Sequence, residues 1–230
     1  DGRSELQNAS EFVHFACTSE DINNLSYALT ISAAVREVWL PKFRSVIAAL
    51  RERAIELRDD AMLAHTHGQP ATPTTMGKEL AVFVYRLDRI LTQIEATEYL
   101  GKFSGATGTF AAHLAADATQ DWPAISNEFV TSLGLTWNPL TTQIESHDWQ
   151  AELYSRIGHA NRVLHNLCTD VWTYISMGYF RQIPQPGATG SSTMPHKINP
   201  IRFENAEANL VLSSALLDSL AATLAPSRLQ

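Results

Sequence analysis

The apolar residues of this chain recur with the period of long helices. From Pro73 onward their spacing alternates between four and three residues, while the charged residues fall mostly outside this stripe. The pattern predicts an amphipathic helix of roughly thirty residues. Its buried stripe is expected to consist of Met76, Leu80, Phe83, Leu87, Ile90 and Ile94.

A second apolar stripe is longer, since it runs from Leu153 to Gly178 at the same spacing. It predicts a helix from about His147 to Phe180, which at ~1.5 Å per residue would be roughly 50 Å long. The other faces of this helix also carry large apolar residues, among them Val163 and Trp172. A helix of this length that is apolar on several sides is expected to be buried between subunits.

Two further segments have a helical pattern. One covers residues 21–57, where Pro41 is expected to kink or break the helix. The other covers 200–224, and its inward-facing residues are expected to be Phe203, Leu210, Leu217 and Leu224. Connections rich in Gly, Thr and Pro lie between the helices, at 65–75, 101–109, 137–142 and 183–193. The sequence therefore predicts an all-α bundle of long helices, with one bundle region spanning 1–230 and polar loops at the helix ends.

The composition argues against several classes of protein. The 230 residues carry a formal net charge of −7, and no basic face of the kind that binds nucleic acid is visible. No apolar run reaches the ~18 residues that a membrane span requires. Cys17 and Cys168 lie far apart in no metal-like spacing, so we interpret both as reduced thiols of a cytoplasmic protein. Neither end resembles a natural terminus, and we expect the chain to be a fragment.

The stretch G-S-S-T-M-P-H-K-I-N-P, residues 190–200, contains the first candidate chemistry. Asn199 is a suitable N-cap and Pro200 a suitable first helical residue, so the stretch approaches the positive end of a helix. Lys197 adds a full positive charge, and no acidic residue lies between Phe180 and Asn199. These features favour a loop that binds a carboxylate. A connector that leads into a well-capped helix explains the same spacing.

A candidate proton-transfer residue lies in the stretch H-T-H-G-Q-P-A-T-P, residues 65–73. Gly68, Pro70 and Pro73 favour an irregular backbone, so we expect His67 to lie in a loop at the start of a helix. A histidine in such a loop can transfer protons near neutral pH. The alternative is a structural histidine at the surface or in a hydrogen bond. The two histidines of this stretch have no third ligand nearby, so no metal site is predicted.

Two more polar stretches precede predicted helices. In residues 15–25, Thr18 and Ser19 stand before Glu20 and Asp21, an order that an ordinary N-terminal capping box also explains. In residues 138–148, Gln143 is a candidate ligand contact, and a solvated loop residue is the simpler interpretation.

Together these stretches resemble one family of enzymes. Residues 190–200 match the G-S-S-x-M-P-x-K-x-N-P signature of the fumarase/aspartase superfamily. T-S-E-D-I-N-N-L at 18–25 and T-H-G-Q-P-A-T-P-T-T-M-G-K-E at 66–79 are similar to the adenylosuccinate lyases of many bacteria. The resemblance implies elimination of fumarate from adenylosuccinate, giving AMP, and from the ribotide SAICAR, giving AICAR. It also implies an all-α bundle, a homotetramer with active sites shared between subunits, and no metal or organic cofactor.

The resemblance implies a role for each matching residue. Ser191 would be the general base that removes a proton from carbon, and His67 the general acid that protonates the leaving nitrogen. Glu204 would orient the histidine. The implied substrate contacts are Thr18, Ser19, Thr66, Gln143, Lys197 and Asn199.

The chemistry of the implied reaction is consistent with these roles. The proton that is removed lies on a carbon next to a carboxylate, so the intermediate is a carbanion that carries additional negative charge. A helix N-terminus and Lys197 can stabilise that charge and can also favour an ionised Ser191. We expect the signature loop to be mobile and to close on the substrate, which would exclude water.

The chain departs from the family pattern in two respects. Ala188 stands where many members have a glutamate two residues before the signature glycine. An upstream His-Asp segment, and an arginine-bearing segment expected directly after Gln230, lie outside residues 1–230. The alternatives are another lyase of the superfamily, acting on argininosuccinate, aspartate or a carboxymuconate, and a non-catalytic crystallin-like protein. The joint presence of the implied catalytic residues argues against the last of these.

Overall fold

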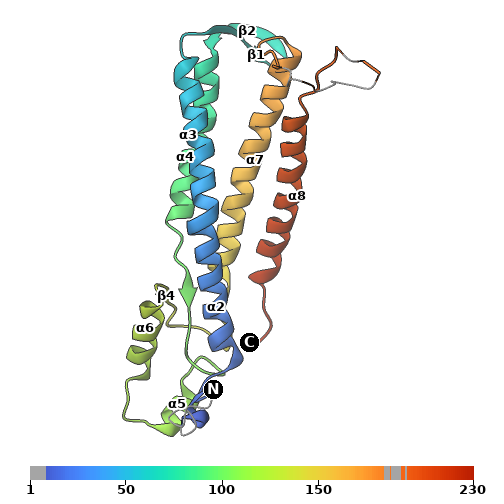
Figure 1. The fold of residues 1–230 in the computed structure, drawn as a ribbon. Coiled ribbons are helices and arrows are strands. Elements are labelled where there is room, and N and C mark those ends of the chain that lie inside the picture. Colours follow the sequence, from blue (N-terminus) through green and yellow to red (C-terminus); the bar gives the residue numbers. More distant parts are fainter. Residues whose placement is uncertain (1–8, 184–186, 188–192, 195) are drawn as a thin grey trace. The chain divides into compact units, whose positions relative to one another are not determined.

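Long helices dominate the computed structural model, which describes residues 9–183, 187, 193–194 and 196–230 (Figure 1). The chain divides into two compact units. The first comprises Asp1–Leu40, Thr97–Ala151 and Ala222–Gln230, and the second comprises Pro41–Ala96 and Glu152–Ala221. None of the helices in the described part of the chain is long and apolar enough to cross a membrane.

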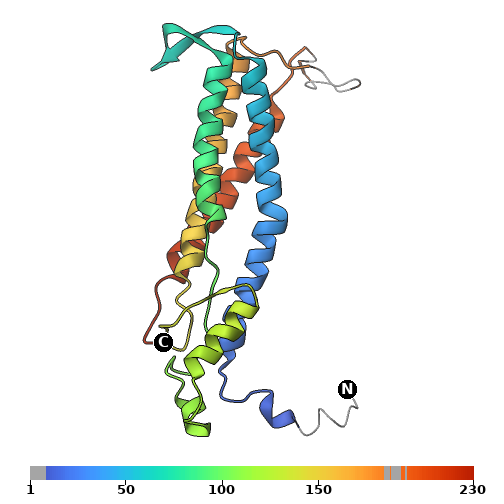
Figure 2. The ribbon, with the colours of Figure 1, turned by 90° about the vertical axis from the view of Figure 1, so that its left-hand side faces the viewer.

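Four long helices make up most of the second unit (Figure 2). They are α3 (Leu40–Glu56), α4 (Met76–Glu95), α7 (Asp148–Ser176) and α8 (Ile201–Leu224). All six residues of the predicted α4 stripe are buried, so the pattern identified the core-facing side of this helix correctly. The predominance of helix confirms the predicted all-α architecture.

The longest predicted helix is confirmed as α7, although it stops before Phe180. Gly178 has a φ of +80°, a conformation that glycine adopts without strain. The amide of Tyr179 donates to the carbonyl of Tyr174 at 2.9 Å, which is part of a Schellman cap. Gly178 therefore ends the helix instead of continuing its apolar stripe.

The predicted helix over 21–57 forms with a different internal geometry. α2 (Ser19–Ala33) continues through a π-helical turn at Ala34–Trp39 into α3 without a break. The amide of Leu40 accordingly donates to the carbonyl of Val35. In a regular helix, the ring of Pro41 would clash with the carbonyl four residues before it. The disturbance expected at this proline therefore takes the form of a wider π turn upstream of it.

The connection predicted before α4 is not irregular. β1 (Ala61–Thr66) and β2 (Gln69–Thr75) pair as an antiparallel hairpin, which both views place at one end of the helices of the second unit (Figures 1 and 2). Pro70 and Pro73 fit into β2 because a two-stranded sheet consists only of edge strands, where a missing N–H is tolerated. The expected loop is thus a small sheet with a defined turn.

The first unit contains α2 and several short elements that the periodicity did not predict. They are η1 (Ser10–Phe12), α5 (Ala111–Ala116), α6 (Trp122–Ser132) and the parallel pair β3 (Leu100–Gly101) and β4 (Thr136–Trp137). Except for α6, these elements contain too few turns or residues for an apolar repeat to be recognised. In α6 the buried residues are Ser126 and Val130, so a polar residue occupies one inward position and the apolar repeat is interrupted.

The last predicted helix forms as α8, but its apolar residues are less buried than expected. The four residues expected to face inward are only half-buried, and none of the described residues of α8 is fully buried. Three apolar residues near its middle are mostly exposed, at 57% for Val211, 63% for Leu212 and 61% for Leu216. This helix therefore presents a large apolar surface.

Candidate active site

The N-terminus of α2 carries two of the predicted substrate contacts. Thr18 precedes the first helical residue, Ser19, and is half-buried, whereas Ser19 is exposed. The carboxylate of Asp21 accepts a hydrogen bond from the amide of Thr18 at 2.9 Å. This bond satisfies a backbone donor at the start of the helix. The capping interpretation of this stretch is therefore confirmed, and it is compatible with a binding role.

Gln143 reaches this helix start from another segment of the first unit. Its Nε2 donates to Oγ1 of Thr18 at 3.3 Å. The loop that carries Gln143 is held by Glu145, a carboxylate that is 1% exposed. Glu145 accepts hydrogen bonds from the Asn138 side chain at 3.0 Å and from the His147 amide at 2.9 Å. Two residues named by the family resemblance are thus in direct contact.

A buried polar cluster next to this helix start was not found from the sequence. Asp21 and Lys102 are both 0% exposed, and their Oδ1 and Nζ lie 2.8 Å apart. Asn24 is also buried and bonds both backbone groups of Lys102, accepting from its amide at 2.8 Å and donating to its carbonyl at 3.0 Å. The available signal was the three-residue spacing of Asp21 and Asn24, which places two polar side chains on the buried face of α2.

A buried histidine lies beside this cluster. His113 is 2% exposed, and neither of its ring nitrogens has a hydrogen-bond partner among the described residues. Its ring contacts three other aromatic rings, those of Phe103, Phe110 and Trp122. Burial lowers the pKa of His113, an effect that Asp21 opposes and Lys102 reinforces. His113 is therefore a neutral core residue at neutral pH.

His67 lies at the tip of the β1–β2 hairpin, so the prediction of a loop at a helix start is wrong. His67 and Gly68 have φ values of +54° and +73° and connect Thr66 with Gln69. Two consecutive residues with positive φ define a type I′ hairpin turn. Both Thr66 and His67 are exposed. Pairing of the flanking strands, which the prolines seemed to exclude, produces this placement.

Side chains from neighbouring elements anchor the base of this hairpin. The hydroxyl of Tyr179 donates to the carbonyl of Leu63 at 3.0 Å, and the hydroxyl of Thr74 donates to Oε1 of Glu79 at 2.9 Å. The hairpin is therefore held at its base, while its turn remains exposed.

Tyr174 lies near Glu79, one of these anchoring residues. Burial, followed by the nearby Glu79 carboxylate, raises the pKa of Tyr174 to about 12, so its hydroxyl stays neutral.

α8 begins one residue later than the sequence predicts. The amides of Phe203 and Glu204 donate to the carbonyl of Pro200, at 3.0 and 3.3 Å. Pro200 thus occupies the cap position that was expected for Asn199. Lys197 and Asn199 are exposed residues just before the helix. The positive end of α8 and the charge of Lys197 are therefore close in the chain, as predicted.

Glu204 lies in the first turn of α8 and contacts the neighbouring helix. Its Oε1 accepts a hydrogen bond from the indole of Trp172 at 3.1 Å. Glu207 makes a similar contact, since its Oε1 accepts from the hydroxyl of Thr169 at 2.6 Å. Among the hydrogen bonds described for this chain, the partner of Glu204 is thus Trp172 and not His67.

The predicted site residues are distributed over both units. The first unit contains Thr18, Ser19 and Gln143, and the second contains Thr66, His67, Lys197, Asn199 and Glu204. Of these, the structure brings Thr18 and Gln143 into hydrogen-bonding contact. Ser191 and Ala188 lie outside the described residues, so the assignment of the base and the closing of the loop stay predictions.

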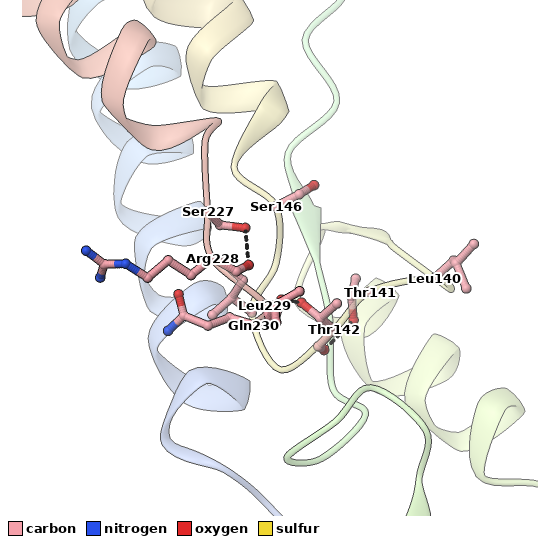
Figure 3. A pocket seen from close by; sticks show the side chains of 9 residues that line it. Leu140, Thr141, Thr142, Ser146, Ser227, Arg228, Leu229 and Gln230 are labelled. Carbon is pink, nitrogen blue, oxygen red and sulfur yellow. Dashed lines mark hydrogen bonds between the residues drawn. The ribbon is translucent and has the colours of Figure 1, made fainter.

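A pocket of about 570 Å³ in the first unit includes residues on both sides of Gln143 in the chain (Figure 3). Its lining consists of Leu140, Thr141, Thr142, Ile144, Ser146, Ser227, Arg228, Leu229 and Gln230. In Figure 3 the guanidinium of Arg228 points away from Thr141 and Thr142. The pocket contains none of the predicted site residues, and we assign it no role. Within the described ranges, no three His, Cys, Asp or Glu side chains form a group that could hold a metal ion.

Comparison with known families defines the class of this protein. The profile of a family described as lyase matches residues 2–214. The chain therefore belongs to the lyase family. A solved structure, that of 3-carboxy-cis,cis-muconate lactonizing enzyme from Pseudomonas putida, has a similar fold, with a TM-score of 0.78 and 25% sequence identity. The match covers 98% of this chain and 50% of that one.

Curated relatives indicate which lyases this chain resembles. It is 53% identical over 226 residues to a protein named adenylosuccinate lyase from Escherichia coli (strain K12). This match covers 98% of this chain and 50% of the relative. Identity is 52% over 227 residues to the Vibrio cholerae adenylosuccinate lyase and 50% over 226 residues to that of Haemophilus influenzae, again with 98% of this chain and 50% of the relative covered. The chain spans about half the length of the curated relatives it matches.

Proposed function

We propose that this chain is part of an adenylosuccinate lyase. In this proposal the protein acts in the cytoplasm and eliminates fumarate from adenylosuccinate, leaving AMP, and from SAICAR, leaving AICAR. The observation that carries the proposal is the 50–53% identity to proteins of that name over 98% of the chain. The contact between Thr18 and Gln143 adds support, because the resemblance names both residues as substrate contacts.

The proposed chemistry is an elimination without a metal ion. Ser191 removes a proton from the carbon next to a carboxylate, and the electron pair left on that carbon forms the new carbon–carbon double bond as the carbon–nitrogen bond breaks. His67 then donates a proton to the departing nitrogen. Lys197 and the positive end of α8 stabilise the negative charge that develops on the carboxylate. Glu204 orients the imidazole in this scheme.

The exposed turn of the hairpin supports the role of His67. A general acid must reach a group on the substrate, and His67 is accessible on a turn whose base is anchored. The remaining proposed contacts, Ser19, Thr66 and Asn199, are exposed as well and can meet a ligand without rearrangement of the core.

We also propose that the protein forms a homotetramer in which subunits share active sites. The exposed apolar residues of α8 support this proposal, because a surface that contains Val211, Leu212 and Leu216 at 57–63% exposure is typical of a protein interface. The double change Leu212→Glu with Leu216→Glu should reduce the mass measured by sedimentation to that of smaller species. The control Asn127→Glu adds a negative charge at an exposed polar residue of α6 and should leave the mass unaltered.

The reaction is tested by following fumarate through its ultraviolet absorbance. The full-length protein is incubated separately with adenylosuccinate, SAICAR and argininosuccinate. We expect fumarate from the first two substrates alone. Release from argininosuccinate only would identify another lyase of the superfamily, and release from none would favour a non-catalytic protein. Ser191→Ala should abolish turnover while the oligomer stays intact, and a variant that retains turnover would refute Ser191 as the base.

A further inference from the structure

The ion pair between Asp21 and Lys102 takes no part in the proposed reaction, yet it is fully buried. Both side chains are 0% exposed, with Nζ 2.8 Å from Oδ1. Removal of two charges from water carries a large desolvation cost, and an apolar pair of similar volume often stabilises a fold as well or better. Packing alone therefore does not account for this pair.

The hydrogen bonds of the pair join the start of α2 to a distant loop. The carboxylate of Asp21 accepts from the amides of Thr18 at 2.9 Å, Ser104 at 3.0 Å and Gly105 at 3.1 Å. The ammonium group of Lys102 also donates to the carbonyl of Gly105 at 2.9 Å. One carboxylate thus holds both the backbone of Thr18 and the backbone of residues 104–105.

Asn24 reinforces the same junction from one turn further along α2. Its side chain bonds both the amide and the carbonyl of Lys102, at 2.8 and 3.0 Å. Asp21 and Asn24 lie three residues apart, so both point from one side of the helix toward the loop. The start of α2 therefore has a defined position relative to residues 102–105.

The loop continues to the segment that carries Gln143. The hydroxyls of Ser104 and Thr141 lie 3.4 Å apart. Gly108 packs so closely that an added Cβ would lie 2.1 Å from the carbonyl oxygen of Thr141. Gln143, two residues further, donates to Oγ1 of Thr18. The contacts therefore form a closed path from Thr18 through the loop and back to Thr18.

We propose that Asp21 and Lys102 are positioning residues, which hold Thr18 and Gln143 at the spacing that the substrate requires. This inference rests on the proposed function, because it takes Thr18 and Gln143 as substrate contacts. The pair acts through the backbone of Thr18 and through the loop at 104–108, and it touches no substrate atom. A misplacement of about 1 Å at contacts of this kind can reduce catalytic efficiency by roughly 100-fold.

The test uses Lys102→Met in the full-length protein, with two readouts. We expect the KM for adenylosuccinate to rise at least about tenfold while kcat stays within about threefold, the pattern of lost uniform binding. We also expect a crystal structure of the variant to lack the hydrogen bond between Gln143 and Thr18. Ile47→Ala, in the core of the second unit, serves as the control: it should lower the melting temperature but leave KM within about twofold.

The double variant Asp21→Asn with Lys102→Met provides a second test in case Lys102→Met does not fold, because it removes both charges together and leaves no buried charge without a partner. It should raise KM in the same direction and weaken the same contact. An unchanged KM, or an intact Gln143–Thr18 hydrogen bond, in the folded variant overturns the inference. Failure of the unmodified protein to release fumarate from adenylosuccinate would instead refute the proposed function, and the crystallographic contact would then decide the positioning role alone.

Discussion

The start of α2 and the hairpin turn that carries His67 are built in opposite ways. Next to Thr18, charged and polar side chains are fully buried and bonded to one another and to the backbone. At His67, the turn is exposed and only the base of the hairpin is anchored. The comparison indicates that the proposed substrate contact is held by buried polar side chains, whereas the proposed general acid lies on a turn whose anchoring contacts are confined to the base of the hairpin.

Removal of the imidazole from the exposed turn should have the largest effect. His67→Asn should lower kcat/KM for adenylosuccinate by about 10²- to 10⁴-fold, the usual contribution of a general acid. Stability should be unchanged, because Asn-Gly is the preferred pair in a type I′ turn. Fumarate absorbance and urea unfolding measure the two quantities. His159→Asn, at another exposed histidine, should leave most of the activity, and full activity in His67→Asn would contradict the assignment.

Disruption of the buried ion pair near Thr18 should affect the stability of the fold instead. Asp21→Ala leaves the ammonium group of Lys102 buried without its partner, so we expect the free energy of unfolding to fall by about 3–5 kcal/mol. Lys197→Ala, at an exposed position before α8, should change it by no more than about 0.5 kcal/mol. Urea denaturation of both variants gives the comparison. Equal changes in the free energy of unfolding of the two variants would show that the buried pair contributes little to stability.

The stability of the region around the buried cluster should also depend on pH, through His113. Because burial lowers its pKa, the folded state binds this proton less readily than the unfolded state does. Stability should therefore be intact above the unfolded pKa of about 6.5 and should decrease as the pH falls below it, by at most about 1.4 kcal/mol per pH unit. In His113→Leu, the free energy of unfolding should change less between pH 7 and pH 5 than it does in the unmodified protein. An unaltered pH dependence in that variant would exclude His113 as the cause.

The smallest effect is expected from the geometry of the exposed turn. Gly68 and Gly134 both have positive φ, at +73° and +78°, and an added Cβ at either position would meet nothing within 4 Å. Alanine at either site should cost about 1 kcal/mol through backbone strain alone. Only Gly68→Ala should also reduce kcat, because it alters the turn that presents His67. Urea unfolding and steady-state kinetics separate the two effects.

Local sequence was sufficient for the long helices and for the cap at Thr18. The apolar stripes predicted α4 and α7 because a helix that buries one side needs an apolar residue every three or four positions. The positions of helix ends were less accurate. Gly178 was taken as part of a stripe, although its left-handed conformation ends α7, and the residues around His67 were taken as a loop because their prolines obscured the strand pairing.

The sequence by itself determined the helical architecture and the family, since periodicity and short motifs depend only on residues that are close together in the chain. Only the tertiary structure decided what Asp21 and Asn24 do. Their partners lie 78 to 84 residues away, at Lys102, Ser104 and Gly105, and local spacing contains no information about contacts at that separation. Asp21, which the sequence suggested only as part of a cap, and Asn24 belong to a buried polar cluster of the first unit, because polar groups and charges removed from water must find partners within the protein.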